Sequence, residues 1–360
     1  MISRRATHLI AIGVAVVGSF LLETSAAFAE PYIAVRTGLK CAQCHVNRTG
    51  GGKRTEFGLI YAQTQLFLHR VKLRGESSFF DGKLSNAVSI GGSLRADYET
   101  TFDTEGQGGD RLEGSDDFGL SQATVYLQAD LIPNVVTFYA DQIVAPDSRN
   151  RELFGLFQGL PLNSYVKMGR MLLPYGLRLL DDEAFIRNRT GYTYERHAVG
   201  AEVGLEPGSL SLIANLTADQ LSFTGSTVHR KFRVGASYGR SRAEGGDSVW
   251  GAFVGFNFGR FTLLGEGNFI SAGEVDRFAA LAEMDFLVRR GLNLKVTYEF
   301  FDRNRDVSND RDGQDRITIG LEPFVTQFVQ VRVSYQINAF IPQNLAENQN
   351  RLIAQLHTFF

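Results

Sequence analysis

The sequence predicts an all-β protein, a transmembrane antiparallel β-barrel of about 16 strands, with 14 strands as the alternative because closed bacterial barrels have an even strand number. Three observations lead to this prediction. Beyond about residue 88, segments of alternating apolar and polar side chains recur, each bounded by turn residues. The chain begins with a segment of export-signal type, and it ends on an aromatic residue, Phe360.

The composition agrees with aromatic-rich strands joined by tight turns. The 360 residues include 38 glycines, 28 phenylalanines and 12 tyrosines, but only two cysteines and one tryptophan. A hydrophobic share of 44% and a charged share of 21% exclude a disordered chain. The formal net charge of -2 argues against nucleic acid as a partner.

The N-terminus has the pattern of a secretory signal peptide covering residues 1–29. Arg4 and Arg5 precede an apolar run over residues 9–22, and an Ala-x-Ala pattern predicts cleavage after Ala29. A membrane anchor is the alternative, but the uncharged run is short for a full span. No other segment approaches the roughly 18 apolar residues of a membrane helix. The mature chain is therefore expected in the periplasm, outside the cell or in the outer membrane.

The last segment favours the cell outer membrane, with its lipid as a partner. Apolar residues alternate with Ile353, Gln355 and His357 as far as Phe360. A last strand that ends in phenylalanine resembles the terminal strand of bacterial outer-membrane barrels. The alternative is a soluble protein that happens to end in two phenylalanines.

Alternation of period two places one set of side chains on each face of a sheet. Residues 277–288, 292–301 and 329–338 are the clearest runs. Runs of about 9–11 residues with charged inward positions match a membrane barrel, whereas soluble strands are nearer five or six residues. Short turns are expected at 132–134, 206–208, 290–291 and 322–323. The alternation of short and long connections fails once, around 218–230, which predicts a further strand there.

The expected inward positions carry charges of both signs. Such charges either hold a plug or form an ion-selective constriction. A solvated wall without selectivity is the alternative interpretation. The predicted inward residues are Arg95, Lys231, Arg233, Lys295 and Arg332, with Asp130, Glu266, Glu283, Asp285 and Glu299 opposing them.

Both cysteines lie in the pentapeptide Cys41-Ala42-Gln43-Cys44-His45, the attachment signal of c-type haem. The spacing lets Cys41 and Cys44 form thioethers with the two haem vinyl groups, and His45 then lies under the iron as its proximal ligand. The sequence thus predicts one covalent haem c. A thioredoxin-type pair would need a strand–helix setting, and a zinc site would need more ligands than are close by. A plain disulfide is the remaining alternative.

The segment between the signal peptide and the barrel is small. Residues 30–86 are few for an independent core around a macrocycle, so a haem held there would gain from burial against another surface. The barrel lumen offers that surface. We therefore expect three parts: a signal peptide (1–29), a c-type cytochrome segment that plugs the lumen (30–86), and the barrel (87–360).

The residues from Thr37 to Gly58, followed by an alternating barrel, resemble the fused outer-membrane monohaem cytochrome–porins, whose best-known members are iron oxidases. The resemblance covers this short stretch and the architecture, and it transfers roles only to Cys41, Cys44 and His45. It implies electron transfer across the outer membrane, from a reduced metal ion such as Fe(II) outside the cell to a periplasmic cytochrome or other electron carrier. This barrel is shorter than those of the iron oxidases. Separately, Gly169–Arg178 resembles a stretch of phosphate-selective porins.

The sixth iron ligand is assigned to His69, the mature histidine nearest in sequence to the motif. It ends a helix predicted over residues 55–69. The alternative role of His69 is an interaction with the helix dipole. Met168 and Met171 are the alternative ligands, and their other interpretation is packing.

The predicted function is single-electron transfer through one c-type haem held in or at a porin-like barrel. Whether the protein is an electron carrier or an iron-oxidase-like oxidoreductase stays open at this point. The alternative is an outer-membrane porin for small anions in which the haem has a structural or sensing role.

Overall fold

The computed structural model describes residues 30–72, 79–105, 109–179, 181, 183–194, 196–243, 245–340 and 345–360. The predicted signal peptide lies outside these residues. Within the described parts of the chain, no helix is long and apolar enough to span a membrane.

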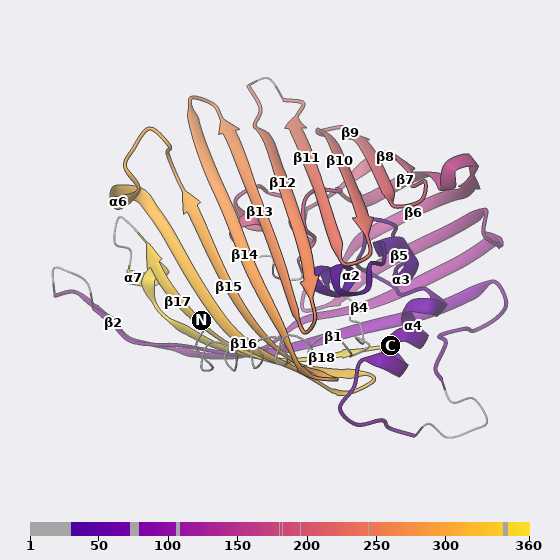
Figure 1. Ribbon diagram of the computed structural model, residues 1–360, viewed down its shortest axis with the longest axis horizontal. Helices are drawn as coiled ribbons and strands as arrows, with labels where there is room; N and C mark the ends of the chain where they lie inside the picture. The colour runs from indigo at the N-terminus through magenta and orange to yellow at the C-terminus, as the bar shows by residue number, and fades with distance from the viewer. Residues whose placement is uncertain are drawn as a thin grey trace, which may run out of the picture.

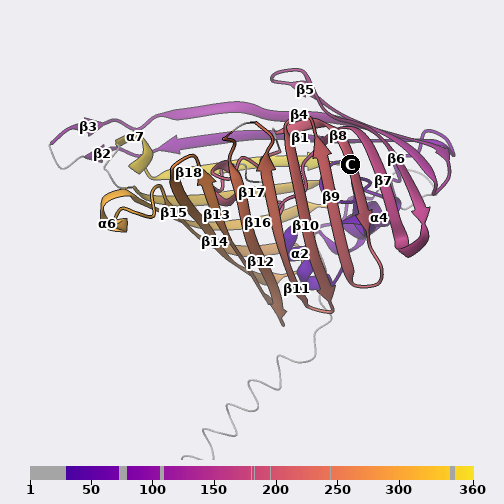
Figure 2. The ribbon, with the colours of Figure 1, turned by 90° about the horizontal axis from the view of Figure 1, so that it is seen from above.

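Sixteen antiparallel strands form a closed barrel (Figures 1 and 2). Each strand pairs with its neighbour in the sequence, and β1 closes the barrel by pairing with β18. The prediction of 16 strands is therefore confirmed. The barrel strands are β1 (Val88–Thr101), β4 (Asp116–Ile132), β5 (Val136–Ala145), β6 (Arg149–Leu160), β7 (Ser164–Leu172), β8 (His197–Leu205), β9 (Leu210–Thr217), β10 (Gln220–His229), β11 (Phe232–Ser241), β12 (Ser248–Phe258), β13 (Phe261–Ala272), β14 (Val275–Arg289), β15 (Leu292–Asp302), β16 (Gly313–Thr326), β17 (Val329–Phe340) and β18 (Arg351–Phe359).

The remaining elements are short and do not form part of the barrel wall. A small hairpin projects from one end of the barrel, opposite the end near α4 (Figures 1 and 2). The hairpin strands are β2 (Thr104–Glu105) and β3 (Arg111–Leu112). The helices are α2 (Pro31–Thr37), α3 (Cys41–Cys44), α4 (Glu56–Gln65), η1 (Pro161–Asn163), α5 (Phe185–Asn188), α6 (Asn309–Asp312) and α7 (Leu345–Asn348).

Strand β12 shows how the alternating sequence forms the wall. Trp250 and Val254 are 53% and 44% exposed on the outside, whereas Val249 and Phe253 are buried inside. Trp250 also stacks on Phe269 of β13, with ring centroids 4.4 Å apart. Aromatic side chains at the rim of an apolar outer face are typical of membrane barrels.

The inner wall is polar, as predicted. Glu202, Thr262, Asn268, Asp285 and Asn293 are all fully buried from solvent. Lipid cannot satisfy backbone hydrogen bonds, so a spanning sheet must close on itself. The closed barrel is apolar outside and polar inside, and it is an outer-membrane barrel.

The connections confirm most of the predicted turns and correct two expectations. Strand β10 fills the region where a further strand was predicted. Residues 322–323 are not a turn, because β16 continues to Thr326 and a bulge beside Phe324 accommodates Pro323 near the strand end. Lys231 is exposed in the turn between β10 and β11 rather than on the inner wall.

The outer face gives a direct test of membrane insertion. We expect Val254→Arg to lower the free energy of unfolding by about 2–4 kcal/mol, because an arginine then faces lipid near the middle of β12. Denaturant titration of the barrel in lipid vesicles measures this value. Val254→Leu is the matched control and should unfold like the natural protein. Equal stability of both variants would mean that this face does not contact lipid.

Candidate functional site

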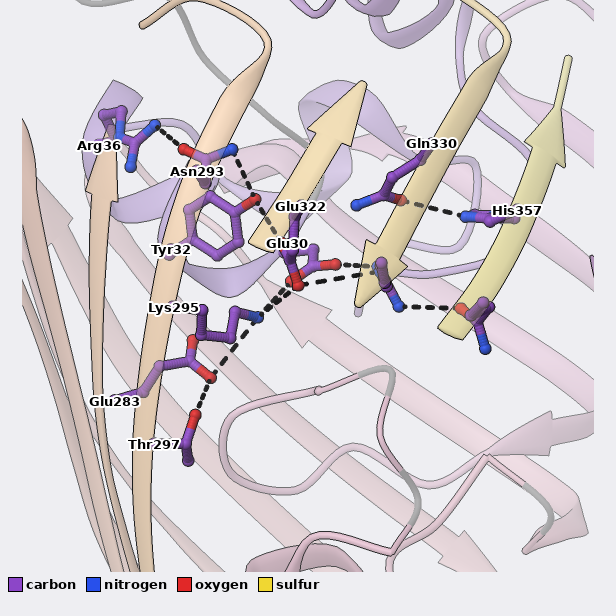
Figure 3. A network of polar contacts seen from close by, with 12 residues as sticks. Glu30, Tyr32, Arg36, Glu283, Asn293, Lys295, Thr297, Glu322, Gln330 and His357 are labelled. Atoms are coloured by element: carbon purple, nitrogen blue, oxygen red, sulfur yellow. Dashed lines mark hydrogen bonds and ion pairs between the residues drawn. The ribbon is translucent and has the colours of Figure 1, made fainter. Parts of the chain in front are cut away.

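The N-terminal end of the described chain is held in the lumen by charged residues of the wall (Figure 3). The carboxylate of Glu30 forms ion pairs with Arg332 and with Lys295, the latter at 2.9 Å. Burial alone would raise the pKa of Glu30, but the charges of Arg332 and Lys295 outweigh it and hold the pKa at about 2. The Tyr32 hydroxyl donates to Glu322 over 3.2 Å. These contacts fix the start of α2 against β15–β17.

Helix α2 packs against β12 and β13, and the chain then reaches the cysteine motif. Arg36, almost fully buried, donates to Asn293 of β15 over 3.2 Å. Gly38 ends the helix at φ 69°, a conformation that favours glycine. In both Figures 1 and 2, α2 lies within the outline of the barrel.

The motif forms a single helical turn, α3, followed by an extended residue. The His45 amide donates to the Cys41 carbonyl over 2.9 Å, which closes the turn. His45 then pairs with Arg54 in a short antiparallel bridge, and the Thr55 amide donates to the Cys44 carbonyl over 3.0 Å. The cysteines and the imidazole are therefore held together by local backbone hydrogen bonds. The two thiols are not joined in a disulfide.

Three consecutive glycines turn the chain back over the motif. Gly50, Gly51 and Gly52 have φ angles of 97°, 80° and 65°. A Cβ on Gly50 would lie 3.3 Å from the Cys41 sulfur, and one on Gly52 only 2.2 Å from the Tyr139 hydroxyl. Only glycine adopts this path without strain or overlap.

Buried polar contacts join this loop to the barrel wall. Asn47 is fully buried, and its amide donates to the Glu152 carboxylate over 2.8 Å. Lys167 donates to the Asn47 side-chain oxygen over 3.2 Å. The Lys53 amide donates to the Tyr139 hydroxyl over 3.0 Å. Because these partners come from β5, β6 and β7, the loop is fixed to one side of the wall.

The described residues of the connection after β7 (173–179, 181 and 183–194) fold into the lumen. Its Tyr175 hydroxyl donates to Asn268 over 2.8 Å, and its Leu177 amide donates to Glu266 over 2.5 Å. Further along, the Phe185 amide donates to Glu299 over 2.6 Å. The stretch that resembles phosphate-selective porins thus runs from the wall into the interior.

These elements enclose a cavity that Cys41, Cys44 and His45 line together. About 1250 Å³ of space within it is free of atoms, part of it continuous with solvent. Apart from the motif, the lining includes apolar and aromatic side chains and several cations: Ile33, Leu66, Leu177, Tyr61, Tyr126, Tyr194, Phe359, Arg54, Arg95, Arg178 and Arg233.

The donor set of this cavity fits a c-type haem. Nδ1 of His45 is buried without a hydrogen-bond partner among the described residues. Burial, and then the charge of Arg54, lower the pKa of His45 to about 3. The ring is therefore neutral, which is the form that ligates a metal. Burial also raises the pKa of the Cys44 thiol to about 11.

His69 does not lie on this cavity. Helix α4 ends at Gln65, one turn earlier than predicted, because the amides of Leu68 and His69 donate to the carbonyls of Phe324 and Val325 instead. The chain there joins the end of β16, and the His69 side chain is exposed. The assignment of His69 to the iron stays a prediction that this arrangement does not support.

The alternative methionine ligands also lie elsewhere. Met168 is 61% exposed on the outer face. Met171 is buried in an apolar cluster with Tyr139 and Phe154. The Asn215 amide lies 3.1 Å from its sulfur.

A second imidazole on the cavity, His357 of β18, was not assigned from the sequence. It is 5% exposed, and its Nε2 lies 3.0 Å from the Ser93 hydroxyl. Its Nδ1 lies 3.2 Å from the side-chain oxygen of Gln330 (Figure 3). Its inward position follows from the alternation with lipid-facing Leu356, but its proximity to the motif depends on how the barrel closes.

The comparisons with solved structures agree with the barrel. OmpT of Vibrio cholerae is similar over 77% of this chain and 99% of its own, with a TM-score of 0.58 and 11% identity. An anion-selective porin from Comamonas acidovorans is similar over 76% of this chain and 99% of its own, with a TM-score of 0.58 and 11% identity. OprB of Pseudomonas putida is similar over 76% of this chain and 94% of its own, with a TM-score of 0.59 and 10% identity. The chain is a porin-like outer-membrane barrel.

No protein-family model matches the chain, and no curated protein matches its sequence. The likeness to porins covers about three quarters of the chain, which is the share that the barrel occupies from Val88 onward.

The glycine turn can be tested by a pair of substitutions. Gly52→Ala combines a positive φ with an overlap against Tyr139, so we expect the loop to detach and trypsin to cleave at Lys53 and Arg54 several-fold faster. Gly245→Ala is the control: its φ is 67°, with nothing within 4 Å of the added carbon. The backbone strain of about 1–2 kcal/mol is then common to both variants. Equal cleavage rates at residues 53–54 would contradict the steric argument.

Proposed function

We propose that this barrel holds one covalently attached c-type haem in its lumen and passes single electrons across the outer membrane. The observation that carries the proposal is the meeting of Cys41, Cys44 and His45 on one lumenal cavity. No other described arrangement in the chain supplies two thiols and an imidazole together. The Nδ1 atom of His45, which is buried without a hydrogen-bond partner among the described residues, supports the same conclusion.

Each residue of the motif has a role in this proposal. Cys41 and Cys44 hold the macrocycle as thioethers, and His45 ligates the iron. A haem bound there supplies a one-electron carrier. The loop with Gly50–Gly52 covers the cysteine side of the cavity, and Gly176, Leu177 and Arg178 of the inward connection line another side.

His357 is the candidate for a second residue that would bind the haem iron. An amide oxygen only accepts hydrogen bonds, so the Nδ1–H of His357 donates to the side-chain oxygen of Gln330. The lone pair then resides on Nε2, where Ser93 is its present partner. A histidine whose second nitrogen is held by an outer hydrogen bond is the usual form of a metal ligand.

The electron source and acceptor come from the family resemblance. Oxidation of Fe(II) to Fe(III) at the cell surface releases one electron, and a periplasmic cytochrome or other carrier takes it up. Both ends of the described chain, Glu30 and Phe360, line the cavity near the end of the barrel with short turns. This position favours exchange with a periplasmic partner.

A porin for small anions is the second candidate, and the likeness to solved porins favours it more directly than it favours electron transfer. One of these proteins is an anion-selective porin by name. A second lumenal cavity, with about 1790 Å³ of space free of atoms, shares Glu30 and Arg95 with the first. Its lining carries charges of both signs, which suits an aqueous path.

Haem attachment separates the two candidates. We expect the natural protein to stain for haem on a denaturing gel, because thioethers survive denaturation, and the Cys41→Ser, Cys44→Ser double variant to lose the stain while its barrel still inserts. Absence of the stain from the natural protein, expressed with an intact haem-attachment system, would rule out electron transfer. A wide, steady conductance in planar bilayers would then support the porin.

The proposed role of His357 as a second iron ligand is tested by the visible spectrum of the haem-loaded protein. We expect His357→Ala to convert a low-spin spectrum into a high-spin one, because the iron loses a strong nitrogen ligand. His69→Ala is the matched control and should leave the spectrum unchanged. The reverse result would restore the assignment of His69.

A further inference from the structure

Four arginines line the cavity beside the cysteine motif and have no carboxylate partner among the residues that the structure describes. They are Arg54 from the segment after the glycine turn, Arg95 from β1, Arg178 from the inward connection, and Arg233 from β11. They therefore converge on one space from four separate parts of the chain.

Three of these arginines have at least one guanidinium nitrogen that donates no hydrogen bond to the described residues. The Nε atoms of Arg54, Arg95 and Arg233 are buried without a partner among the described residues. Arg233 lies 3.8 Å from the Cys41 sulfur, a weak contact. Arg54 lies over the ring of Phe359 at 4.3 Å.

Arg178 is the exception, and it shows how the group is held in place. It donates to the carbonyls of Gly50 and Leu173, over 3.1 and 2.9 Å. It therefore links the glycine turn to the inward connection. These neutral partners leave its charge uncompensated.

Other lumenal cations of the same wall are paired with carboxylates. Arg151 meets Asp141 at 2.7 Å, and Arg316 meets Glu299 at 2.6 Å. Lys167 meets Glu202 at 2.8 Å. These three cations are each compensated by a carboxylate of the wall, whereas the four arginines on the cavity have no such ion pair among the described residues.

The negatively charged groups that line the cavity do not compensate the four arginines. Glu30 is the one side-chain carboxylate in its described lining, and its oxygens are occupied by Lys295 and Arg332. The backbone of Phe360 pairs with Gly92, and no ion pair between the chain terminus and an arginine is present among the described residues. Lys40 adds a further cation to the lining.

Several cations facing one partly desolvated space repel one another and are stable only if an anion compensates them. Guanidinium groups bind carboxylates through paired, charge-assisted hydrogen bonds. We infer that Arg54, Arg95, Arg178 and Arg233 form a binding site for an anion that carries two carboxylate groups.

Two sources can supply this chemistry. One is the pair of propionate groups of the haem, and in this form the inference rests on the proposed function. The other is a free dicarboxylate in the lumen, which would bind without any haem. Both sources present two carboxylates to the same guanidinium groups.

The first arm of the test uses the haem-loaded protein and the variants Arg95→Gln and Arg233→Gln. Neither side chain bonds to the glycine turn, so the fold around the motif should persist. If the propionates bind here, removing a cation raises their pKa into the measured range, and the midpoint potential rises as the pH falls through mildly acidic values. The natural protein should show a flat profile. Arg240→Gln, an exposed arginine on the same strand as Arg233, is the control for loss of charge and should also be flat.

The second arm uses the Cys41→Ser, Cys44→Ser protein, which cannot hold haem covalently, in planar bilayers with succinate as the probe. If a free dicarboxylate binds here, succinate should reduce the chloride current. Half-block should need about tenfold more succinate in Arg95→Gln and Arg233→Gln, because each loses a charge-assisted hydrogen bond.

The two arms separate the possible failures. A pH-dependent potential in the two variants assigns the site to the haem, and a weakened succinate block assigns it to a free anion. A negative haem stain together with a succinate block would overturn the proposed electron transfer and leave the anion site standing. Flat potentials and no effect of either variant on succinate block would overturn the anion site itself.

Discussion

The pairing of β1 with β18 is the contact on which the rest of the molecule depends. Its register runs from Ser93 opposite Phe359 to Thr101 opposite Arg351, and Phe360 and Gly92 exchange two further backbone hydrogen bonds of 3.1 Å each. Without this seam the sheet would present two edges to lipid, where no water could satisfy them. The seam also builds one wall of the cavity, because Arg95 and His357 both face inward beside it.

The lumen holds the N-terminal segment, whose polar side chains bind complementary side chains of the wall. Glu30 is held by Lys295 and Arg332, and Asn47 by Glu152 and Lys167, so cations and carboxylates of four wall strands bind the N-terminal segment. Residues 173–194 contribute a second inward element. A buried charge without a partner is strongly destabilising. Removal of either element would therefore leave several wall residues uncompensated, which argues that the barrel and its contents fold as one unit.

The sequence predicted those features that depend on local pattern. Period-two alternation predicted the strands and the inward charges, and the missing strand at β10 was expected from the order of short and long connections. Features that depend on how distant strands pair could not be predicted from the local sequence pattern. His357 reaches the cavity only because β18 meets β1. His69 leaves the predicted helix because the chain there hydrogen-bonds to the end of β16, an interaction between residues far apart in sequence.

The distribution of charge in the lumen distinguishes two kinds of site in one barrel. Around Lys295 the wall is rich in carboxylates, and a segment of the protein itself satisfies them. Around the cysteine motif the wall is rich in arginines, and the one side-chain carboxylate in the described lining, Glu30, is paired with Lys295 and Arg332 instead. A wall that only lined a water-filled pore would have no need to bury guanidinium nitrogens without partners, because solvated side chains could extend into the channel. Half-buried arginines that have no carboxylate partner among the described residues, beside two thiols and an imidazole, suit a ligand that is anionic at one edge and anchored by sulfur at the other. A haem attached through its vinyl groups would have that polarity.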